Sequence, residues 1–234
     1  MSGRNKLLLV DIGNTRVKYA YSTEGELAQQ CYAASLVELD LSEVIELRIG
    51  SVARKAEVEQ WLSTLPDDIL IKQAKVSPEA YGVRCIYPDC SRLGVDRWLV
   101  MLAAWNDCRA PCCIVDCGSA ITVEYLDEGG RHEGGYIMPG LRLLKSSLLT
   151  NTAEILVDRT AEGFSTEPGC HTSAAVEHGI NLMFKALQEK ILASLEPNMR
   201  LYITGGDGKI FHRLCGEGDY RPELVMDGLV WALS

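Results

Sequence analysis

The chain has 234 residues, of which 47% are hydrophobic and 24% charged, and its formal net charge is −9. Its length allows one or two domains with a substantial core, and its composition excludes a disordered chain, a fibre and a small disulfide scaffold. The acidic balance argues against a nucleic-acid partner, because proteins that neutralise phosphates are normally basic. Its apolar runs fall short of the about 20 residues that span a membrane. The odd number of cysteines favours a reducing compartment, so we expect a cytoplasmic protein without a membrane partner.

In the first half of the chain, expected strands precede and separate two expected helices. Short apolar or alternating runs predict strands over 7–10, 16–21, 45–52 and 69–73. Apolar residues at helical spacing predict helices over 55–65 and 93–104.

The second half follows a similar order. Strands are predicted over 112–115, 121–126, 131–138 and 201–204, and helices over 141–150, 173–195 and 224–233. Because strand-rich and helix-rich stretches alternate in both halves, the sequence predicts the α/β class.

The two halves also share a motif. Asp11-Ile-Gly-Asn follows one apolar strand, and Asp116-Cys-Gly-Ser follows another, with a further strand after each. We interpret this as an internal repeat of one strand–turn–strand unit, with domains over 1–108 and 109–234.

The first copy of the motif has the composition of a phosphate-binding turn. Gly13 allows a tight turn and a close approach of the backbone, while Asn14, Thr15 and Lys18 offer donors. Asp11 repels phosphate unless Mg²⁺ or water lies between them. The alternative is an ordinary turn with an exposed aspartate, and the second copy at Asp116 favours the functional interpretation.

Two further segments allow both a structural and a functional interpretation. Asp96 lies in the first turn of a predicted helix, where the helix dipole favours an acidic residue. It is equally suited to act as a general base, with Arg97 beside it to bind a carboxylate. The glycine pair in Thr204-Gly-Gly-Asp207 permits close approach of a purine or ribose, or simply forms a strand–helix turn that Asp207 caps.

The cysteines and histidines show no clear ligand pattern. Cys108, Cys112, Cys113 and Cys117 favour a buried strand over a metal site, because paired CxxC spacing is absent. The four histidines have no metal spacing, and we assign them no role.

Five motifs resemble those of type III pantothenate kinases, in the same order and over essentially the whole chain. They are DIGNTRVK (11–18), LGVDRW (93–98), VDCGSAITVE (115–124), GGYIMPGL (134–141) and ITGGD (203–207). The resemblance implies an actin-like ATPase fold of two ribonuclease H-like domains related by pseudo-two-fold symmetry. It implies ATP-dependent phosphorylation of pantothenate to 4′-phosphopantothenate, the first step of coenzyme A biosynthesis.

The resemblance also implies roles for individual residues. ATP would be bound by Asp11, Ile12, Gly13, Asn14, Thr15, Arg16, Val17, Lys18 and Ser119. Pantothenate would be bound by Tyr87, Gly94, Val95, Asp96, Arg97 and Thr172. Asp96 would be the base, and Thr172 would act across the interface of a homodimer. Asp11 would hold Mg²⁺, directly or through water, and Asp116 a monovalent cation, K⁺ or NH₄⁺.

Other functions remain as alternatives at this point. Some members of the same family are described as accessory factors for transcriptional activation, a role that would not need the set Asp11, Asp96, Arg97 and Asp116. A third alternative is a phosphatase or an Hsp70-like ATPase of the wider superfamily. A phosphatase would lack a pantothenate pocket, and an Hsp70-like chaperone would need a peptide-binding domain for which 234 residues leave no room. The second turn departs from the commoner DxGTA pattern of the family, but Ser119 keeps a hydroxyl group.

Overall fold

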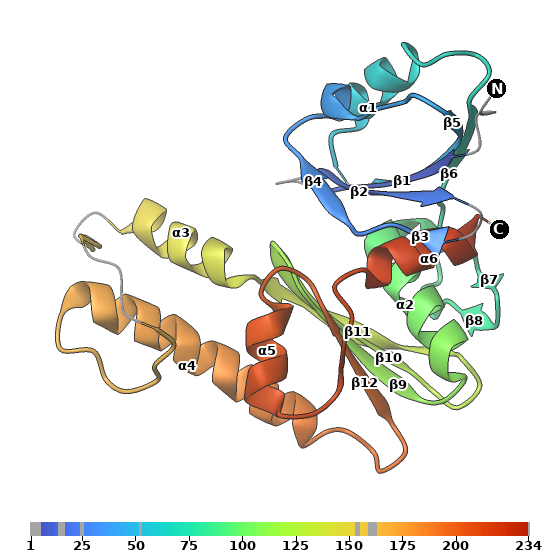
Figure 1. The fold of residues 1–234 in the computed structure, drawn as a ribbon. Coiled ribbons are helices and arrows are strands. Elements are labelled where there is room, and N and C mark those ends of the chain that lie inside the picture. The colour runs from blue at the N-terminus through green and yellow to red at the C-terminus, as the bar shows by residue number, and fades with distance from the viewer. Residues whose placement is uncertain are drawn as a thin grey trace. The chain divides into compact units, whose positions relative to one another are not determined.

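The computed structural model describes residues 6–13, 17–23, 26–51, 53–152, 155–158 and 163–233. Its contacts divide the chain into two compact units (Figure 1). The first contains Met1–Ala110, Leu126–Glu133 and Glu223–Ser234, and the second contains Pro111–Tyr125 and Gly134–Pro222. The predicted second domain, 109–234, thus contributes two segments to the packing of the first unit. The boundary between repeats at 108 and 109 stays a prediction.

The first unit is built on a sheet with the strand order β3-β2-β1-β5-β6, to which β4 adds by pairing with β2. Its central strands β1 and β2 form an antiparallel hairpin, whereas β1, β5 and β6 are parallel. The strands are β1 (Lys6–Ile12), β2 (Val17–Thr23), β3 (Glu26–Leu27), β4 (Cys31–Ala33), β5 (Val44–Ser51) and β6 (Leu70–Gln73).

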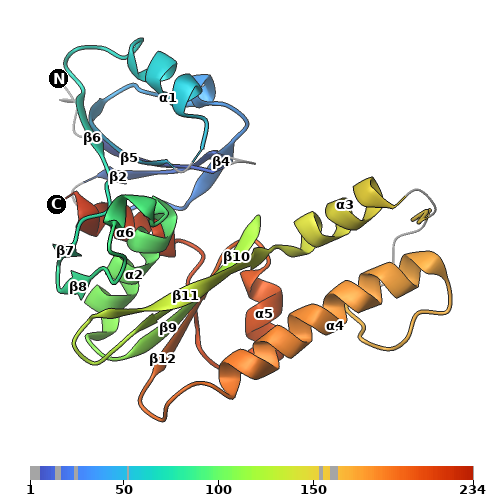
Figure 2. The same cartoon turned by 180° about the vertical axis from the view of Figure 1, so that it is seen from behind.

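Helices cover this first sheet. Val58 and Trp61 of α1 (Lys55–Leu62), with the 3-10 helix η1 (Leu36–Glu38), complete an apolar cluster with the inward side chains of β1 and β5. The helices α2 (Val95–Cys108) and α6 (Leu224–Ala232) pack against each other and contact β5 (Figure 2). Their backbones approach closely at Gly228, where a Cβ atom would lie 2.2 Å from the carbonyl oxygen of Leu99.

The second unit repeats the strand order of the first, as β11-β10-β9-β12-β13. The strands are β9 (Cys112–Cys117), β10 (Ala120–Leu126), β11 (His132–Pro139), β12 (Arg200–Thr204) and β13 (Asp219–Tyr220). The end of β10 and the start of β11, at Leu126 and His132, belong to the first unit. Because β9, β12 and β13 are parallel, as β1, β5 and β6 are, each unit has the same central arrangement.

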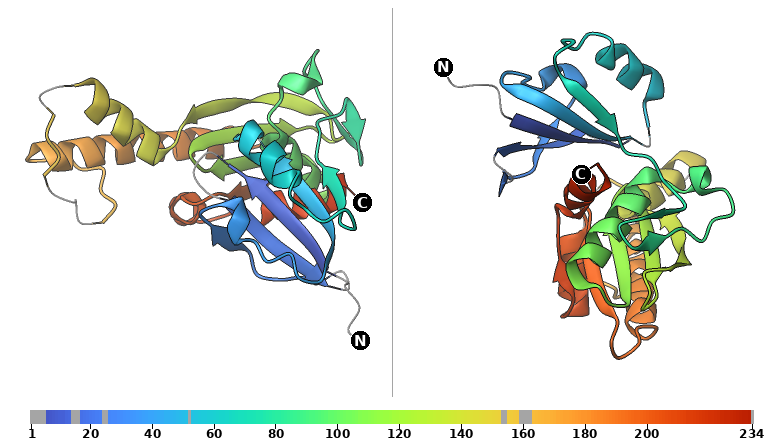
Figure 3. Two further views of the ribbon diagram at one scale, coloured as in Figure 1. Left: turned by 90° about the horizontal axis from the view of Figure 1, so that it is seen from above. Right: turned by 90° about the vertical axis from the view of Figure 1, so that its right-hand side faces the viewer.

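Three helices belong to the second unit: α3 (Leu141–Asn151), α4 (Thr172–Leu192) and α5 (Gly208–Cys215). Figure 3 shows α4 and α5 on one side of the sheet. Phe184 of α4 meets Phe211 of α5 with ring centroids 5.4 Å apart, above the buried Cys113 and Val115 of β9. Cysteine therefore acts as a small apolar residue in this strand, as predicted.

The elements left out of the sequence prediction are short. Among them are α5, β13, the hairpin of β7 (Glu79–Ala80) and β8 (Val83–Arg84), and the 3-10 helices η1 and η2 (Cys90–Arg92). The helix α5 begins at a glycine, a poor helix former, so local propensity gives no signal for it. Within the described parts of the chain, no helix is long and apolar enough to cross a membrane.

Candidate active site

The turn between β1 and β2 holds a buried carboxylate. Asp11, the last but one residue of β1, is 6% exposed and pairs across the hairpin with Lys18, whose Nζ lies 3.3 Å from its Oδ2. Burial raises the pKa of Asp11, Lys18 lowers it, and the charge of Asp96 raises it further. Since one ammonium group leaves the pKa raised, this carboxylate would gain from a further cation.

The other predicted residues of this turn divide into two groups. Ile12 and Val17 are fully buried in the core, so their side chains are unable to touch a nucleotide and only their backbone could. Gly13 lies between them at the end of the strand. The predicted ligands Asn14, Thr15 and Arg16 lie outside the described residues.

The first turn of α2 positions Asp96. Its Oδ1 accepts a hydrogen bond from the N–H of Arg97 at 2.8 Å, so the carboxylate folds back over the start of the helix. Gly94 makes this possible, because a Cβ atom at that position would lie 2.5 Å from Asp96 Oδ1. The carboxylate therefore has a structural contact, and this contact is compatible with a role as a base.

Arg97 and Tyr87, predicted to share one ligand, are in contact. Arg97 is 5% exposed, and its Nη1 donates to the hydroxyl group of Tyr87 at 3.0 Å. The guanidinium carbon also lies 5.7 Å from the centroid of the Tyr87 ring. Val95, the other predicted neighbour, is buried.

His132 joins this pair, although its sequence context gave it no role. Its ring stacks on that of Tyr87, with centroids 5.9 Å apart and planes at 15°. It is fully buried, which is uncommon for histidine. Since Tyr87 and His132 are distant in sequence, no local pattern could have paired them.

The turn between β9 and β10 carries the second aspartate. Asp116 is the last but one residue of β9, as Asp11 is of β1, and lies beside Thr204 in the parallel register of β12. Two backbone hydrogen bonds tie other motifs to this turn: Asp207 N donates to Cys117 O at 2.9 Å, and Gly140 N donates to Ser119 O at 3.0 Å. Asp207 stands at the N-cap position of α5 but its side chain caps no N–H there.

Two glycines are required by the close packing around Asp116. A Cβ atom at Gly205, where φ is +89°, would lie 2.4 Å from Asp116 Oδ1. A Cβ atom at Gly140 would lie 2.4 Å from the carbonyl oxygen of Gly118. The motifs ITGGD and GGYIMPGL therefore contribute closely packed backbone to the surroundings of this turn.

A cavity of about 620 Å³ adjoins these motifs along the chain. Leu141, which follows Gly140, and Ile210, which lies in α5 shortly after Asp207, are part of its lining. The remaining lining residues are Gly163, Phe164, Glu177, Asn181, Arg213 and Leu214. The cavity thus combines apolar walls with a few polar groups, as small-molecule sites do.

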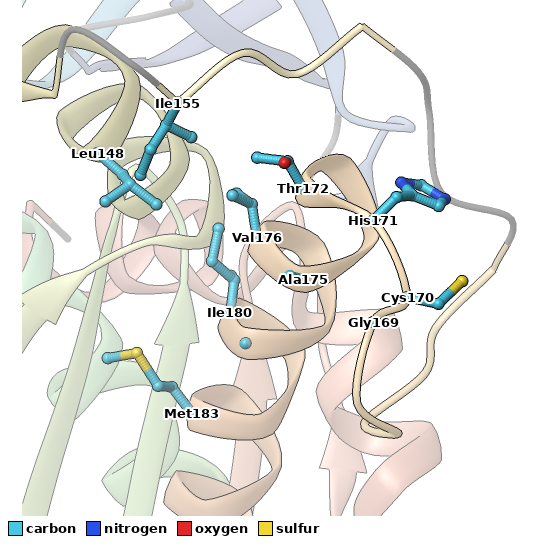
Figure 4. A pocket seen from close by; sticks show the side chains of 11 residues that line it. Leu148, Ile155, Gly169, Cys170, His171, Thr172, Ala175, Val176, Ile180 and Met183 are labelled. Atoms are coloured by element: carbon cyan, nitrogen blue, oxygen red, sulfur yellow. The ribbon is translucent and has the colours of Figure 1, made fainter.

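Thr172 lines a second cavity, of about 630 Å³ (Figure 4). Thr172 is the exposed first residue of α4. Figure 4 shows the apolar side chains of Leu148, Ile155, Val176 and Ile180 beside it.

The side chains present fit a Mg²⁺ site whose coordination is completed by the phosphates of the substrate. Among the described residues, no group of three or more His, Cys, Asp or Glu side chains gathers as a metal site would. Mg²⁺ commonly needs only one or two carboxylates, with phosphates and water completing its octahedron. The buried carboxylate of Asp11 is suited to this arrangement, because a bound cation would offset the cost of burying its charge. The thiols are not, since burial raises the pKa of Cys113 to about 12.

The repeated sheet order, with an aspartate as the last but one residue of β1 and of β9, defines the actin-like fold. A Campylobacter jejuni protein assigned to the Baf family of transcriptional activators has this fold, with a TM-score of 0.63 at 21% identity and 96% coverage of both chains. A Sinorhizobium meliloti protein described as a 2-dehydro-3-deoxygalactonokinase has it too, with a TM-score of 0.59 at 14% identity and 97% coverage of both.

Sequence comparison gives the family. The family model of type III pantothenate kinases matches residues 7–194, and this chain belongs to that family. The type III pantothenate kinase of Marinobacter nauticus is 34% identical over 95% of this chain and 96% of its own length. That of Chromohalobacter salexigens is 37% identical over 97% of this chain and 85% of its own.

The predicted family and the actin-like α/β fold are therefore confirmed, whereas the transcriptional alternative has no support. At 21% identity, the likeness to the Campylobacter jejuni protein shows a shared fold alone.

Proposed function

We propose that this kinase transfers the γ-phosphate of ATP to the hydroxyl group of pantothenate, forming 4′-phosphopantothenate, the first intermediate on the way to coenzyme A. The observation that carries this proposal is the pair of adjacent residues that opens α2. Arg97 presents a buried guanidinium group held by Tyr87, and Asp96 beside it presents a carboxylate. A carboxylated alcohol such as pantothenate needs these two groups.

In this proposal the residues at the start of α2, together with Tyr87, have separate tasks. The guanidinium fork of Arg97 binds the carboxylate of pantothenate, and Tyr87 fixes its orientation. Asp96 accepts the proton of the hydroxyl group as that oxygen attacks phosphorus. Gly94 leaves the space that this carboxylate occupies.

Mg²⁺ would be held at Asp11, directly or through water, and would neutralise charge on the phosphates when bound. Lys18, whose Nζ is 3.3 Å from Asp11, would turn to a phosphate oxygen once the cation compensates that carboxylate. Asp116, at the equivalent position of the repeat, would hold K⁺ or NH₄⁺, and Ser119 would contact a phosphate.

The cavity of about 620 Å³ in the second unit would receive the nucleoside of ATP. Its apolar walls suit a purine, and it adjoins Gly140 and Asp207, which pack on the Asp116 turn. Gly206 would allow the nucleoside to approach the backbone closely, because no atom lies within 4 Å of the place that a Cβ atom would take there.

We further propose a homodimer in the cytoplasm, with Thr172 meeting the substrate of the partner subunit. Leu182 and Met183 of α4 are 55% and 57% exposed, which is typical of a surface that a second copy would cover. Sedimentation of the active protein tests this: a fully active monomer would contradict it.

The proposed activity is tested by measuring ADP release with Mg²⁺ and K⁺ present, with and without pantothenate. We expect turnover that depends on pantothenate and a product heavier by one phosphoryl group. Absence of pantothenate-dependent turnover would refute the proposal.

A further inference from the structure

We propose that His132 is a positioning residue for pantothenate: it backs the Tyr87 ring, which in turn orients the guanidinium group of Arg97. This inference rests on the proposed function, and it extends that function to a residue outside every motif of the family resemblance. The three residues come from three segments of the first unit, namely the loop before η2, the first turn of α2 and the start of β11.

The first step is the restraint on Arg97. One ring supplies two of its contacts, since the hydroxyl group of Tyr87 accepts from Nη1 at 3.0 Å and the guanidinium carbon lies 5.7 Å from the ring centroid. A rotation of the Tyr87 ring would therefore tilt the guanidinium plane. Binding a carboxylate through two parallel hydrogen bonds depends on that plane.

The second step is the restraint on Tyr87. This residue lies in a loop between β8 and η2, so regular backbone hydrogen bonding does not fix it. The His132 ring lies nearly parallel to it, at 15° and 5.9 Å between centroids, which is the offset stacking that aromatic pairs favour. Because His132 is fully buried, its ring has little room to move away.

The third step is the anchoring of His132 itself. The turn before it is closed by Asp127, whose Oδ1 accepts from the N–H groups of Gly129 and Arg131. The same turn is joined to β8, the strand that leads to Tyr87. Arg84 N donates a hydrogen bond to Gly130 O at 3.0 Å, and the backbones of Arg84 and Arg131 form an isolated parallel β-bridge. His132 and Tyr87 thus stand on segments that are hydrogen-bonded to each other.

The test replaces the ring and keeps the fold. We expect His132→Leu to raise the KM for pantothenate about five- to tenfold, the size of one lost aromatic stack, and to leave kcat and the KM for ATP within about twofold. His132→Phe keeps a ring and should restore a KM near that of the wild type. Calorimetric titration of pantothenate should show the same ratio of Kd values without turnover.

The chain offers a matched control. His212 stacks on Tyr220 in the second unit, with centroids 6.0 Å apart and planes at 26°, and has no part in the proposed site. His212→Leu should leave all three kinetic constants unchanged. If His132→Leu does not fold, His132→Gln, which keeps a polar group without a ring, gives the same comparison.

Three results would overturn the proposal. They are an unchanged pantothenate KM in the folded ring-less variant, equal losses for both substrates, or a Phe variant as impaired as the Leu variant. Failure of the proposed function is distinct from these, because the wild-type enzyme itself would then show no pantothenate-dependent turnover.

Discussion

Asp96 makes the same kind of local contact as Asp40, yet we propose a role in catalysis only for Asp96. Asp96 Oδ1 accepts the N–H of Arg97 at 2.8 Å, and Asp40 Oδ1 accepts the N–H of Ser42 at 2.9 Å. An amide at either position keeps an oxygen for the backbone N–H. An amide is unable to take a proton from a substrate hydroxyl group. Replacing each aspartate by asparagine therefore separates the structural contact from catalysis.

We therefore expect Asp96→Asn to lower kcat by about 10²–10⁴, the range for loss of a general base, while ATP binding is kept. Steady-state kinetics and a nucleotide-binding titration measure the two effects. Asp40→Asn is the control and should keep a normal kcat. A near-normal kcat in Asp96→Asn would show that the carboxylate only caps the helix or holds the substrate.

Asp11 should reduce the stability of the protein when no cation is bound. Its pKa in the folded state is raised above its ordinary value, first by burial, so ionisation of this group opposes folding. This loss of stability is present in full above the pKa of Asp11 in the folded state. It disappears as the pH falls towards the pKa of Asp11 in the unfolded state. Asp11→Asn should accordingly raise Tm at neutral pH without Mg²⁺, and this gain should shrink as the pH is lowered through the folded pKa.

Asp40 provides a control of opposite sign for this experiment. Hydrogen bonds from Ser42 lower the pKa of Asp40, so its charged form stabilises the fold above the unfolded-state pKa, and this stability is lost in acid.

Mg²⁺ with ATP should raise Tm more for the wild type than for Asp11→Asn. Equal or lower Tm for Asp11→Asn at neutral pH would contradict the view that this carboxylate awaits a cation.

At the scale of elements, the sequence predicted most strands and helices because each has a clear period or apolar run. The end of β1 at Asp11 and the first turn of α2 at Asp96 were predictable for the same reason, since both follow from local pattern. The pairing of Tyr87 with His132 was not, because it joins a loop to a distant strand. The start of α5 was also missed, because the helix begins at Gly208, a poor helix former. It follows shortly after Gly205, which the close packing around Asp116 requires.

The glycine pair after β12 allows this packing to be tested. Gly205→Ala places a Cβ atom 2.4 Å from Asp116 Oδ1 at a φ of +89°, and we expect it to lower the free energy of unfolding by about 1–3 kcal/mol. The adjacent Gly206 has no atom within 4 Å of a Cβ, so Gly206→Ala should change it by less than about 0.5 kcal/mol. Denaturant unfolding measures both.

A raised KM for ATP in the stable Gly206→Ala variant would further support the nucleoside assignment. Equal stability of the two variants would instead show that the turn adapts to a side chain at Gly205.

At the scale of the whole molecule, the chain does not complete its first unit until its last helix. α6 supplies Leu224, Val225, Met226 and Leu229 to the core of that unit, each at most 3% exposed, and packs directly on α2. The helix that carries Asp96 and Arg97 therefore depends on a segment that follows the entire second unit in sequence. Folding of the first unit should be linked to synthesis of the full chain.

We expect Leu229→Ala to lower the free energy of unfolding by about 2–5 kcal/mol, the usual cost of truncating a buried leucine. Leu229 and Leu99 of α2 both lie close to Gly50 of β5, where an added Cβ atom would be 3.5 Å and 3.0 Å from them. Because Leu99 is within one turn of Asp96 and Arg97, the loss should also weaken pantothenate binding at the first turn of α2. Val37→Ala is the control, since Val37 is 83% exposed and its loss should cost less than about 0.5 kcal/mol. Urea unfolding followed by tryptophan fluorescence reports on this unit through Trp61, Trp98, Trp105 and Trp231, the four tryptophans of the chain. A Leu229→Ala protein as stable as Val37→Ala would show that α6 is dispensable for the first unit.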